Sequence, residues 1–166
     1  MRRIGLLSDT HGFLDPAVFE HFGPCDEIWH AGDIGSLDLA ESLASFRPLR
    51  AVHGNIDDTA IRLKYPENQI FTIENVKVCM THIAGRPGRY PKRVKDMLRQ
   101  EKPQVFICGH SHILRVMYDK EFEALHINPG ACGRQGLHTV RTLIRFDLDN
   151  GKISGLQVIE LGPRGR

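Results

Sequence analysis

Seven side chains that can bind metal ions each follow a short apolar run in this 166-residue sequence. They are carboxylates, imidazoles and one amide: Asp9, His11, Asp33, Asn55, His82, His110 and His112. Carboxylates and imidazoles are common ligands of divalent ions, and an amide oxygen completes a coordination shell without adding charge. Seven donors exceed what one ordinary ion uses beside its water. The set suits two ions that share one bridging carboxylate.

The spacing of these residues adds to the argument. Asp9 and His11 lie two residues apart, so their side chains share one side of an extended segment and can reach the same ion. His110 and His112 have the same spacing, although a loop can direct them to different ions. Gly32 precedes Asp33 and allows a sharp turn with a close approach of the backbone to an ion.

Five apolar runs must position these side chains, and their composition is typical of buried β-strands. The runs are Ile4–Leu7, Ile28–Ala31, Leu49–Val52, Val76–Thr81 and Val105–Cys108. Strands that end side by side bring their last side chains to one place, which is the usual ligand site of an α/β sheet. We therefore expect the seven candidate ligands to meet at one sheet edge.

Helix and turn signals complete the pattern of elements. Asp15–Glu20 begins with an acidic cap and a proline, and Ser36–Leu43 begins with a capping serine, so both are predicted helices. A third helix is expected over Pro91–Glu101. Glu74-Asn75 predicts a tight hairpin, and Asp149–Gly151 predicts a type I′ hairpin turn.

The second half of the chain reads mainly as strands. They are expected over Gln69–Ile73, Ile113–Tyr118, Ala124–Ile127, Thr139–Phe146 and Ile153–Leu161. About ten strands are too many for one sheet with three helices, so we expect two packed sheets with helices outside. Residues 1–163 are expected to form one domain, and residues 164–166 a frayed tail.

Composition excludes several classes of protein. With 41% hydrophobic and 25% charged residues, the chain has an ordinary globular composition and is not disordered. A net charge of +2 without a basic run argues against sequence-specific binding of nucleic acid. The four cysteines are widely separated, which predicts buried free thiols in a reducing compartment. No segment has the length of a signal-peptide core or a membrane span, so the expected location is the cytoplasm, away from membranes.

The motifs together resemble a known family. Asp9-x-His11, Gly32-Asp33, Gly54-Asn55, Thr81-His82 and Gly109–His112, followed by Asn128-Pro129-Gly130, are similar to those of the calcineurin-like metallophosphoesterase superfamily. Within it, the chain looks like the small YfcE-type phosphodiesterases that lack a cap domain. The resemblance covers nearly the whole chain. It implies the metallophosphoesterase fold, a four-layer α/β/β/α sandwich of two mixed β-sheets flanked by helices.

The resemblance also implies a division of the candidate ligands between two ions. One ion would be held by Asp9, His11 and His112, the other by Asn55, His82 and His110, with Asp33 as the bridge. The ligand types point to manganese, iron, zinc, cobalt or nickel in place of calcium or magnesium and do not choose among them; manganese is taken as the first candidate. Two divalent ions per chain are expected, and Asp33 and Asn55 are the expected catalytic residues.

The implied activity is hydrolysis of phosphodiesters, more weakly of phosphomonoesters, by in-line attack of a metal-bridging hydroxide. The expected partner is a small phosphoester substrate, and a homo-oligomer remains open because the C-terminal hairpin leaves a strand edge. Arg86, Arg89 and Arg134 lie in glycine-rich loops after the motifs, which makes them candidates for binding the substrate phosphate.

Two positions depart from the family pattern. Ile56 stands where many superfamily phosphatases have a histidine that protonates the leaving oxygen, and His82 is followed by Ile83-Ala84-Gly85 in place of an immediate glycine. The first departure leaves an alternative function open, because the retromer scaffold subunit of the same fold also lacks this histidine. That scaffold changes its Gly-Asp and Gly-Asn motifs, which are intact here. A metal-bound regulatory protein is the third possibility.

Overall fold

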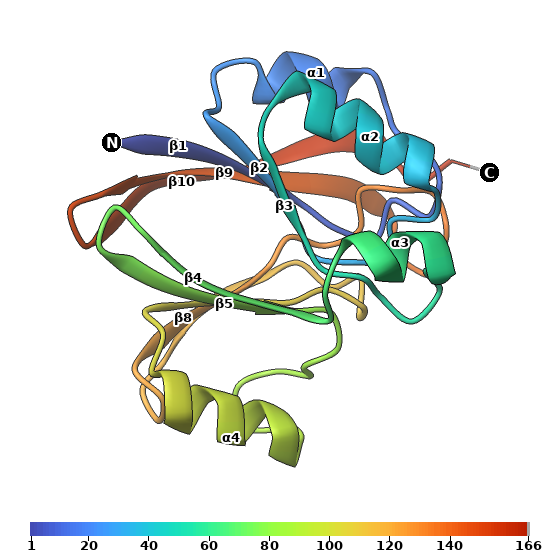
Figure 1. The fold of residues 1–166 in the computed structure, drawn as a ribbon. Coiled ribbons are helices and arrows are strands. Elements are labelled where there is room, and N and C mark those ends of the chain that lie inside the picture. The colour runs from blue at the N-terminus through green and yellow to red at the C-terminus, as the bar shows by residue number, and fades with distance from the viewer. Residues whose placement is uncertain (166) are drawn as a thin grey trace.

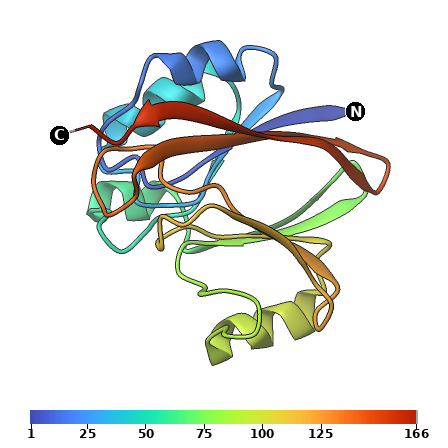
Figure 2. The same cartoon turned by 180° about the vertical axis from the view of Figure 1, so that it is seen from behind.

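Two β-sheets lie face to face between helices and give the protein four layers (Figure 1). The computed structural model describes residues 1–165. Helices α1 (Ala17–Phe22) and α2 (Leu37–Phe46) cover the outer face of one sheet, and α4 (Lys92–Glu101) covers the outer face of the other. The view from behind shows the same order of layers (Figure 2). The predicted α/β/β/α sandwich is confirmed.

The first sheet has the strand order β10-β9-β1-β2-β3. Its strands are β1 (Arg2–Leu7), β2 (Glu27–His30), β3 (Leu49–Ala51), β9 (Val140–Asp149) and β10 (Lys152–Pro163). The strands β1, β2 and β3 are parallel, and α1 and α2 provide the crossovers that parallel neighbours require. The hairpin of β9 and β10 then pairs antiparallel with β1.

The second sheet has the order β4-β5-β6-β8-β7. Its strands are β4 (Asn68–Ile73), β5 (Val76–Thr81), β6 (Val105–Ile107), β7 (Arg115–Asp119) and β8 (Ala124–Asn128). The strands β5, β6 and β8 are parallel, whereas β4 and β7 run antiparallel at the edges. The loops after β5 and β6 therefore leave the sheet at the same end.

The core has one layer between the sheets and one beneath the helices on each side. Val78 and Met80 of β5 face the central layer with Trp29, while Cys79 between them packs toward α4. This alternation follows from the two-residue period of a strand. Each buried run thus places alternate side chains in two apolar layers. Packing on both faces fixes the position of the strand and of its end.

Helix α3 (Thr59–Lys64) corrects the prediction of three helices, since residues 1–165 contain four. The carboxylate of Asp58 accepts a hydrogen bond from the Ile61 amide and caps the helix start. Ile61 is the one buried residue of these six, so the segment has no apolar periodicity that a sequence pattern could reveal.

Both predicted hairpin turns are confirmed by the backbone angles. Glu74 and Asn75 have φ of 50° and 60°, and Asn150 and Gly151 have φ of 43° and 85°. Two consecutive positive φ values are the mark of a type I′ turn. The predicted acidic cap at Asp15 accepts a hydrogen bond from the Ala17 amide at 2.9 Å, although the helix itself begins at Ala17.

A backbone hydrogen bond holds the end of the chain near Thr139. The Arg164 amide donates to the Thr139 carbonyl at 2.9 Å, and Arg166, the end of the predicted tail, lies outside the described residues.

All four cysteines are free and buried, as predicted. Among residues 1–165, none of the helices has the length and apolar character needed to cross a membrane.

Candidate metal centre

The loops after β1, β2, β3, β5 and β6 meet at one edge of the sandwich. Asp9 and His11 follow β1, Asp33 follows β2 and Asn55 follows β3. The second sheet contributes His82 at the end of β5, and His110 and His112 after β6. Because the two sheets pack face to face, these loops come together from both sheets. The structure thus brings the predicted ligands into one site.

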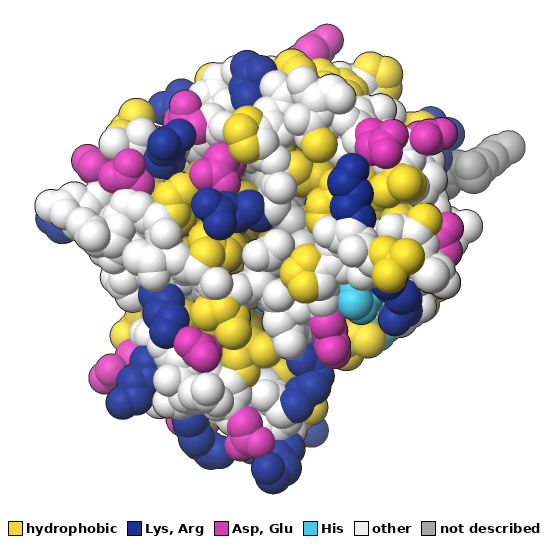
Figure 3. All heavy atoms as spheres, in the orientation of Figure 1, with side chains coloured by type: hydrophobic (Ala, Val, Ile, Leu, Met, Phe, Trp, Pro, Cys, Tyr) yellow, Lys and Arg dark blue, Asp and Glu magenta, His cyan; other side chains and the backbone are white. Residues whose placement is uncertain are grey.

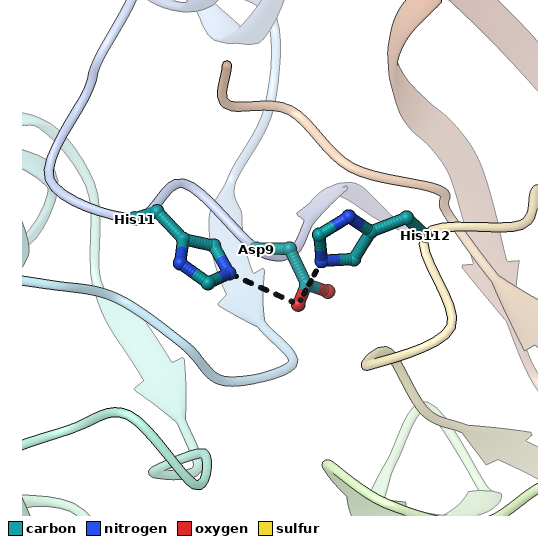
Figure 4. A group of neighbouring side chains, drawn as sticks. All are labelled: Asp9, His11 and His112. Carbon is teal, nitrogen blue, oxygen red and sulfur yellow. Dashed lines mark hydrogen bonds and ion pairs between the residues drawn. The ribbon is translucent and has the colours of Figure 1, made fainter. Parts of the chain in front are cut away.

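Asp9, His11 and His112 form a first group, whose ligand atoms lie within 4.8 Å of one another. The two imidazoles lie on opposite sides of the Asp9 carboxylate and direct Nε2 toward its Oδ1 (Figure 4). The distances to Oδ1 are 3.1 Å from His112 and 3.7 Å from His11. The other carboxylate oxygen, Oδ2, accepts hydrogen bonds from the Ser8 hydroxyl and the His110 amide. One oxygen is therefore held by the protein, and the other faces the imidazoles.

Asp33, His82 and His110 form a second group of the same kind. Asn55 belongs beside it, because its Oδ1 lies 3.0 Å from Nδ1 of His110. The His82 ring is oriented by a contact of 2.7 Å between its Nδ1 and the Ala31 carbonyl. A carbonyl only accepts hydrogen bonds, so Nδ1 carries the proton and Nε2 is left as the ligand atom.

The Oδ2 atom of Asp33 connects the two groups. It lies 3.3 Å from Nε2 of His11 and 3.1 Å from Nε2 of His82. Its Oδ1 accepts a hydrogen bond from the Ile56 amide at 3.1 Å. A carboxylate in this position can touch an ion in each group, which is the arrangement of a bridging ligand.

The donor set fits divalent metal ions. The Nε2 atoms of His11 and His82 are buried and have no hydrogen-bond partner among the described residues. Buried ring nitrogens without a partner are rare unless they bind an ion or a water. Here both face the carboxylates of Asp9 and Asp33, and mixed oxygen and nitrogen donors suit first-row transition metals.

The carboxylates and imidazoles of the site shift one another's pKa values because they lie close together. Burial raises the pKa of Asp9 and Asp33, but the imidazoles around them outweigh burial and hold both carboxyl pKa values below their ordinary range. The nearby carboxylate of Asp33, and next to it that of Asp9, raises the pKa of His11 to about 9. Burial lowers the pKa of His82, yet Asp33 and Asp9 outweigh it and the net direction is upward. A bound cation would replace these protons.

The backbone of the site is strained. Asp9, His11, Asp33, His110 and His112 all have positive φ, between 47° and 70°. Such angles are uncommon for residues other than glycine and cost on the order of 1–3 kcal/mol each. Their concentration at the candidate ligands indicates that the fold holds these side chains in positions that a relaxed chain would not adopt.

Two glycines make the close packing possible. A Cβ at Gly54 would overlap the carboxylate and the amide nitrogen of Asp33, and a Cβ at Gly109 would overlap Ser8 and Asp9. The Gly54-Asn55 and Gly109–His112 motifs therefore need glycine because the loops from neighbouring strands touch at these points.

Two polar side chains hold the loops together. The Asp57 carboxylate accepts hydrogen bonds from the amides of Ile34, Gly35 and Gly54, at 2.7 to 3.2 Å, and so ties the loops after β2 and β3. The Asn128 amide group donates to the Gly109 carbonyl at 3.0 Å. The sequence motif at Asn128 thus supports the site, whereas the sequence motifs did not indicate the role of Asp57 in joining two loops.

The arginines predicted to bind phosphate are exposed and remain untested in that role. Arg86 and Arg89 form a turn of their own, in which the Arg89 amide donates to the Arg86 carbonyl. The Arg134 guanidinium lies 3.8 Å from the centre of the Phe13 ring. Two other arginines, Arg62 and Arg93, line a cavity beside Asn55 and His82. The sequence motifs did not indicate these two residues.

Comparison with known proteins decides the family. The sequence profile of the calcineurin-like phosphoesterase superfamily domain matches residues 1–151. The chain belongs to this superfamily. It is 30% identical over 135 residues to a probable metallophosphoesterase of Methanothermobacter thermautotrophicus, which covers 77% of this chain and 76% of the relative. The resemblance stated from the motifs is confirmed, and membership supports a metal-dependent phosphoester hydrolase.

Solved structures share the fold of this superfamily member. A novel archaeal phosphodiesterase superposes with a TM-score of 0.77 at 23% identity, covering 96% of this chain and 99% of its own. Vps29 of Chaetomium thermophilum superposes equally well, with a TM-score of 0.77 at 14% identity and 97% of each chain covered. At these identities the two likenesses show the fold and leave the function to be argued from the site.

The raised pKa values predict how stability depends on pH. A histidine whose pKa rises on folding stabilises the protein below its unfolded pKa, and this contribution is lost as pH rises through the folded value. The metal-free protein should therefore lose thermal stability between about pH 6.5 and about pH 9, the range over which His11 contributes. The midpoint of thermal unfolding, recorded against pH in the presence of a chelator, measures this loss.

A substitution isolates the contribution of His11 to this pH dependence of stability. His11→Gln should flatten this pH dependence, whereas His21→Gln, which changes a histidine on α1 outside the site, should leave it as in the unmodified protein. Identical curves for the unmodified protein and His11→Gln would show that the carboxylates do not hold a proton on this ring.

Proposed function

We propose that the protein is a phosphodiesterase that works with two divalent metal ions, of which manganese is the first candidate. The supporting observation is the Asp33 carboxylate, whose Oδ2 faces an imidazole of each ligand group at 3.3 and 3.1 Å. A residue shared in this way gives two ions a common ligand. Asp9, His11 and His112 would hold one ion, and Asn55, His82 and His110 the other.

The residues divide the work of such a reaction between them. Bound divalent ions would supply a nucleophilic hydroxide near neutral pH and neutralise charge on the phosphoryl oxygens. Asp33 fixes the two ligand groups relative to each other, and Asn55 contributes a neutral oxygen beside His110. The hydrogen bonds to Oδ2 of Asp9 hold its carboxylate so that Oδ1 keeps facing the ligand groups.

Position 56 limits the range of substrates. The Ile56 side chain is apolar and exposed, and its backbone amide is engaged with Asp33. It cannot donate a proton to a departing oxygen. The proposed reaction therefore favours esters whose leaving group departs without protonation, because a positioned general acid is typically worth about 10²–10⁴-fold in rate.

The setting of the proposed reaction is the cytoplasm, with a small phosphoester as substrate. The four free, buried cysteines support a reducing compartment, because secreted proteins of this size commonly form disulfides.

Substitution of the bridging residue tests the proposal. Asp33→Asn removes a charge that both ligand groups share, so it should lower manganese content from two ions per chain and reduce turnover of bis-p-nitrophenyl phosphate by about 100-fold or more. His112→Ala and Asn55→Ala should each weaken one ion and be partly rescued by excess manganese. Elemental analysis and absorbance at the nitrophenolate band measure both effects.

The outcomes separate the proposed enzyme from a scaffold. All three variants should keep the circular dichroism spectrum of the unmodified protein, since the residues lie in loops outside the apolar core. Full activity with two ions in Asp33→Asn would contradict the assignment of this site. Two bound ions without turnover of any phosphoester would favour the scaffold function instead.

The missing proton donor gives a second prediction, on the leaving group. In a series of aryl methyl phosphates, the rate should fall steeply as the pKa of the leaving phenol rises, because nothing at position 56 protonates the departing oxygen. Ile56→His should flatten this dependence and raise the rate of the poorest leaving groups by up to about 100-fold. Ile56→Gln is the matched control, and a flat dependence in the unmodified protein would reveal another proton donor.

A further inference from the structure

A cavity of about 290 Å³ opens beside the second ligand group. Asn55 and His82 contribute to its wall, so the cavity is continuous with the candidate metal centre. Arg62 of α3 and Arg93 of α4 also line it, together with Glu67. In Figure 3 the surface next to α3 shows histidine, basic and acidic side chains close together. A substituent on a phosphate bound at the metals would enter this cavity.

Arg62 is fixed to the cavity wall and still has donors to spare. Its Nε donates to the Asp57 carbonyl at 2.7 Å, and its Nη2 lies 3.2 and 3.3 Å from the carbonyls of Gly54 and Asn55. A guanidinium carries five N–H groups in a rigid plane. The two on Nη1 have no partner among the described residues, so they remain for a ligand.

Arg93 is held in the same manner from the second sheet. Its Nη1 donates to the Thr81 hydroxyl at 3.3 Å, and its Nη2 donates to the Ile83 carbonyl. Its Nε has no partner among the described residues. Both guanidinium groups are therefore oriented by neutral oxygens of the loops that also carry Asn55 and His82.

Neither guanidinium is neutralised by the protein. No carboxylate of residues 1–165 lies within 4.0 Å of Arg62 or Arg93, although Arg50 and Arg141 each pair with a carboxylate at 2.7 Å. Among the residues that line the cavity, Glu67 is the one acid against two arginines. The cavity thus offers fixed, unpaired positive charge, which is the usual chemistry of oxyanion recognition.

We propose that this cavity binds one ester substituent of the substrate and that Arg62 and Arg93 recognise an anionic group on it, a carboxylate or a second phosphate. This inference rests on the proposed phosphodiesterase function and narrows it. The preferred substrates are diesters in which one substituent carries its own negative charge. Simple alkyl or aryl diesters leave the two arginines without a partner.

Non-hydrolysable ligands test the cavity without relying on turnover. Phenylphosphonate is the reference, and 3-carboxyphenylphosphonate and 1,3-phenylenediphosphonate add a carboxylate or a second phosphonate. Calorimetry with the manganese-loaded protein should show at least one charged ligand binding about tenfold more tightly than the reference, as one charge-assisted contact provides. The stronger of the two identifies the class of anion.

Substitutions test whether the arginines cause the tighter binding of the charged ligand. Arg62→Gln and Arg93→Gln should each reduce the tenfold ratio of affinities, charged ligand over phenylphosphonate, to about twofold. The affinity for phenylphosphonate itself should change little. Arg99→Gln removes the same charge from α4 outside the cavity lining and should keep the full preference. An equal loss of affinity for all three ligands would show that Arg62 and Arg93 only brace the loops, and would overturn the inference.

The test distinguishes failure of the cavity from failure of the proposed function. Turnover of phosphodiesters without any preference for the charged phosphonates would leave the function standing and refute the role of the cavity. A clear preference for the charged phosphonates in a protein that hydrolyses no phosphoester would refute the proposed function and leave the role of the cavity standing, because the anion site would then serve binding alone.

Discussion

The carboxylates of Asp9 and Asp33 are buried at the junction of the two sheets, and the rest of the site is arranged around them. Buried carboxylates are costly unless hydrogen bonds and positive charge compensate them. Each keeps one oxygen engaged, on Ser8 for Asp9 and on the Ile56 amide for Asp33, and turns the other toward imidazoles. In the absence of ions, the carboxylates raise the pKa values of His11 and His82 and so favour positively charged imidazoles beside them. Two divalent ions would supply it more fully, which makes the site a metal centre by its electrostatics as well as by its ligands.

The fold stabilises a local arrangement that the chain alone would avoid. Five of the seven candidate ligands have positive φ, and this strain is tolerated because contacts around the loops leave them little freedom. The Asp57 carboxylate binds amides of two loops, and Asn128 holds the carbonyl of Gly109. The apolar layers fix the strand ends from which these loops start. Packing in the core is thus what positions the ligands, although no ligand contributes to the core itself.

Much of this arrangement could be predicted because its signals are local. Apolar runs predicted the strands, and the residues directly after them predicted the candidate ligands. Helix α3 escaped prediction because it buries one residue, Ile61, and so carries no periodic pattern. Arg62 and Arg93 escaped it for another reason: they lie on the helices α3 and α4, and tertiary folding alone brings them to the same cavity. Glycine-rich loops after the motifs pointed to Arg86, Arg89 and Arg134 instead, and their role in binding phosphate remains a prediction.

The central claim is that Asp33 lies between two ions. Anomalous diffraction from crystals of the manganese-loaded protein, recorded at the manganese absorption edge, tests it most directly. The account predicts two peaks per chain, one among Asp9, His11 and His112 and one among Asn55, His82 and His110, with the Asp33 carboxylate between them. A single peak at saturating manganese, or two peaks of which neither adjoins Asp33, would contradict it.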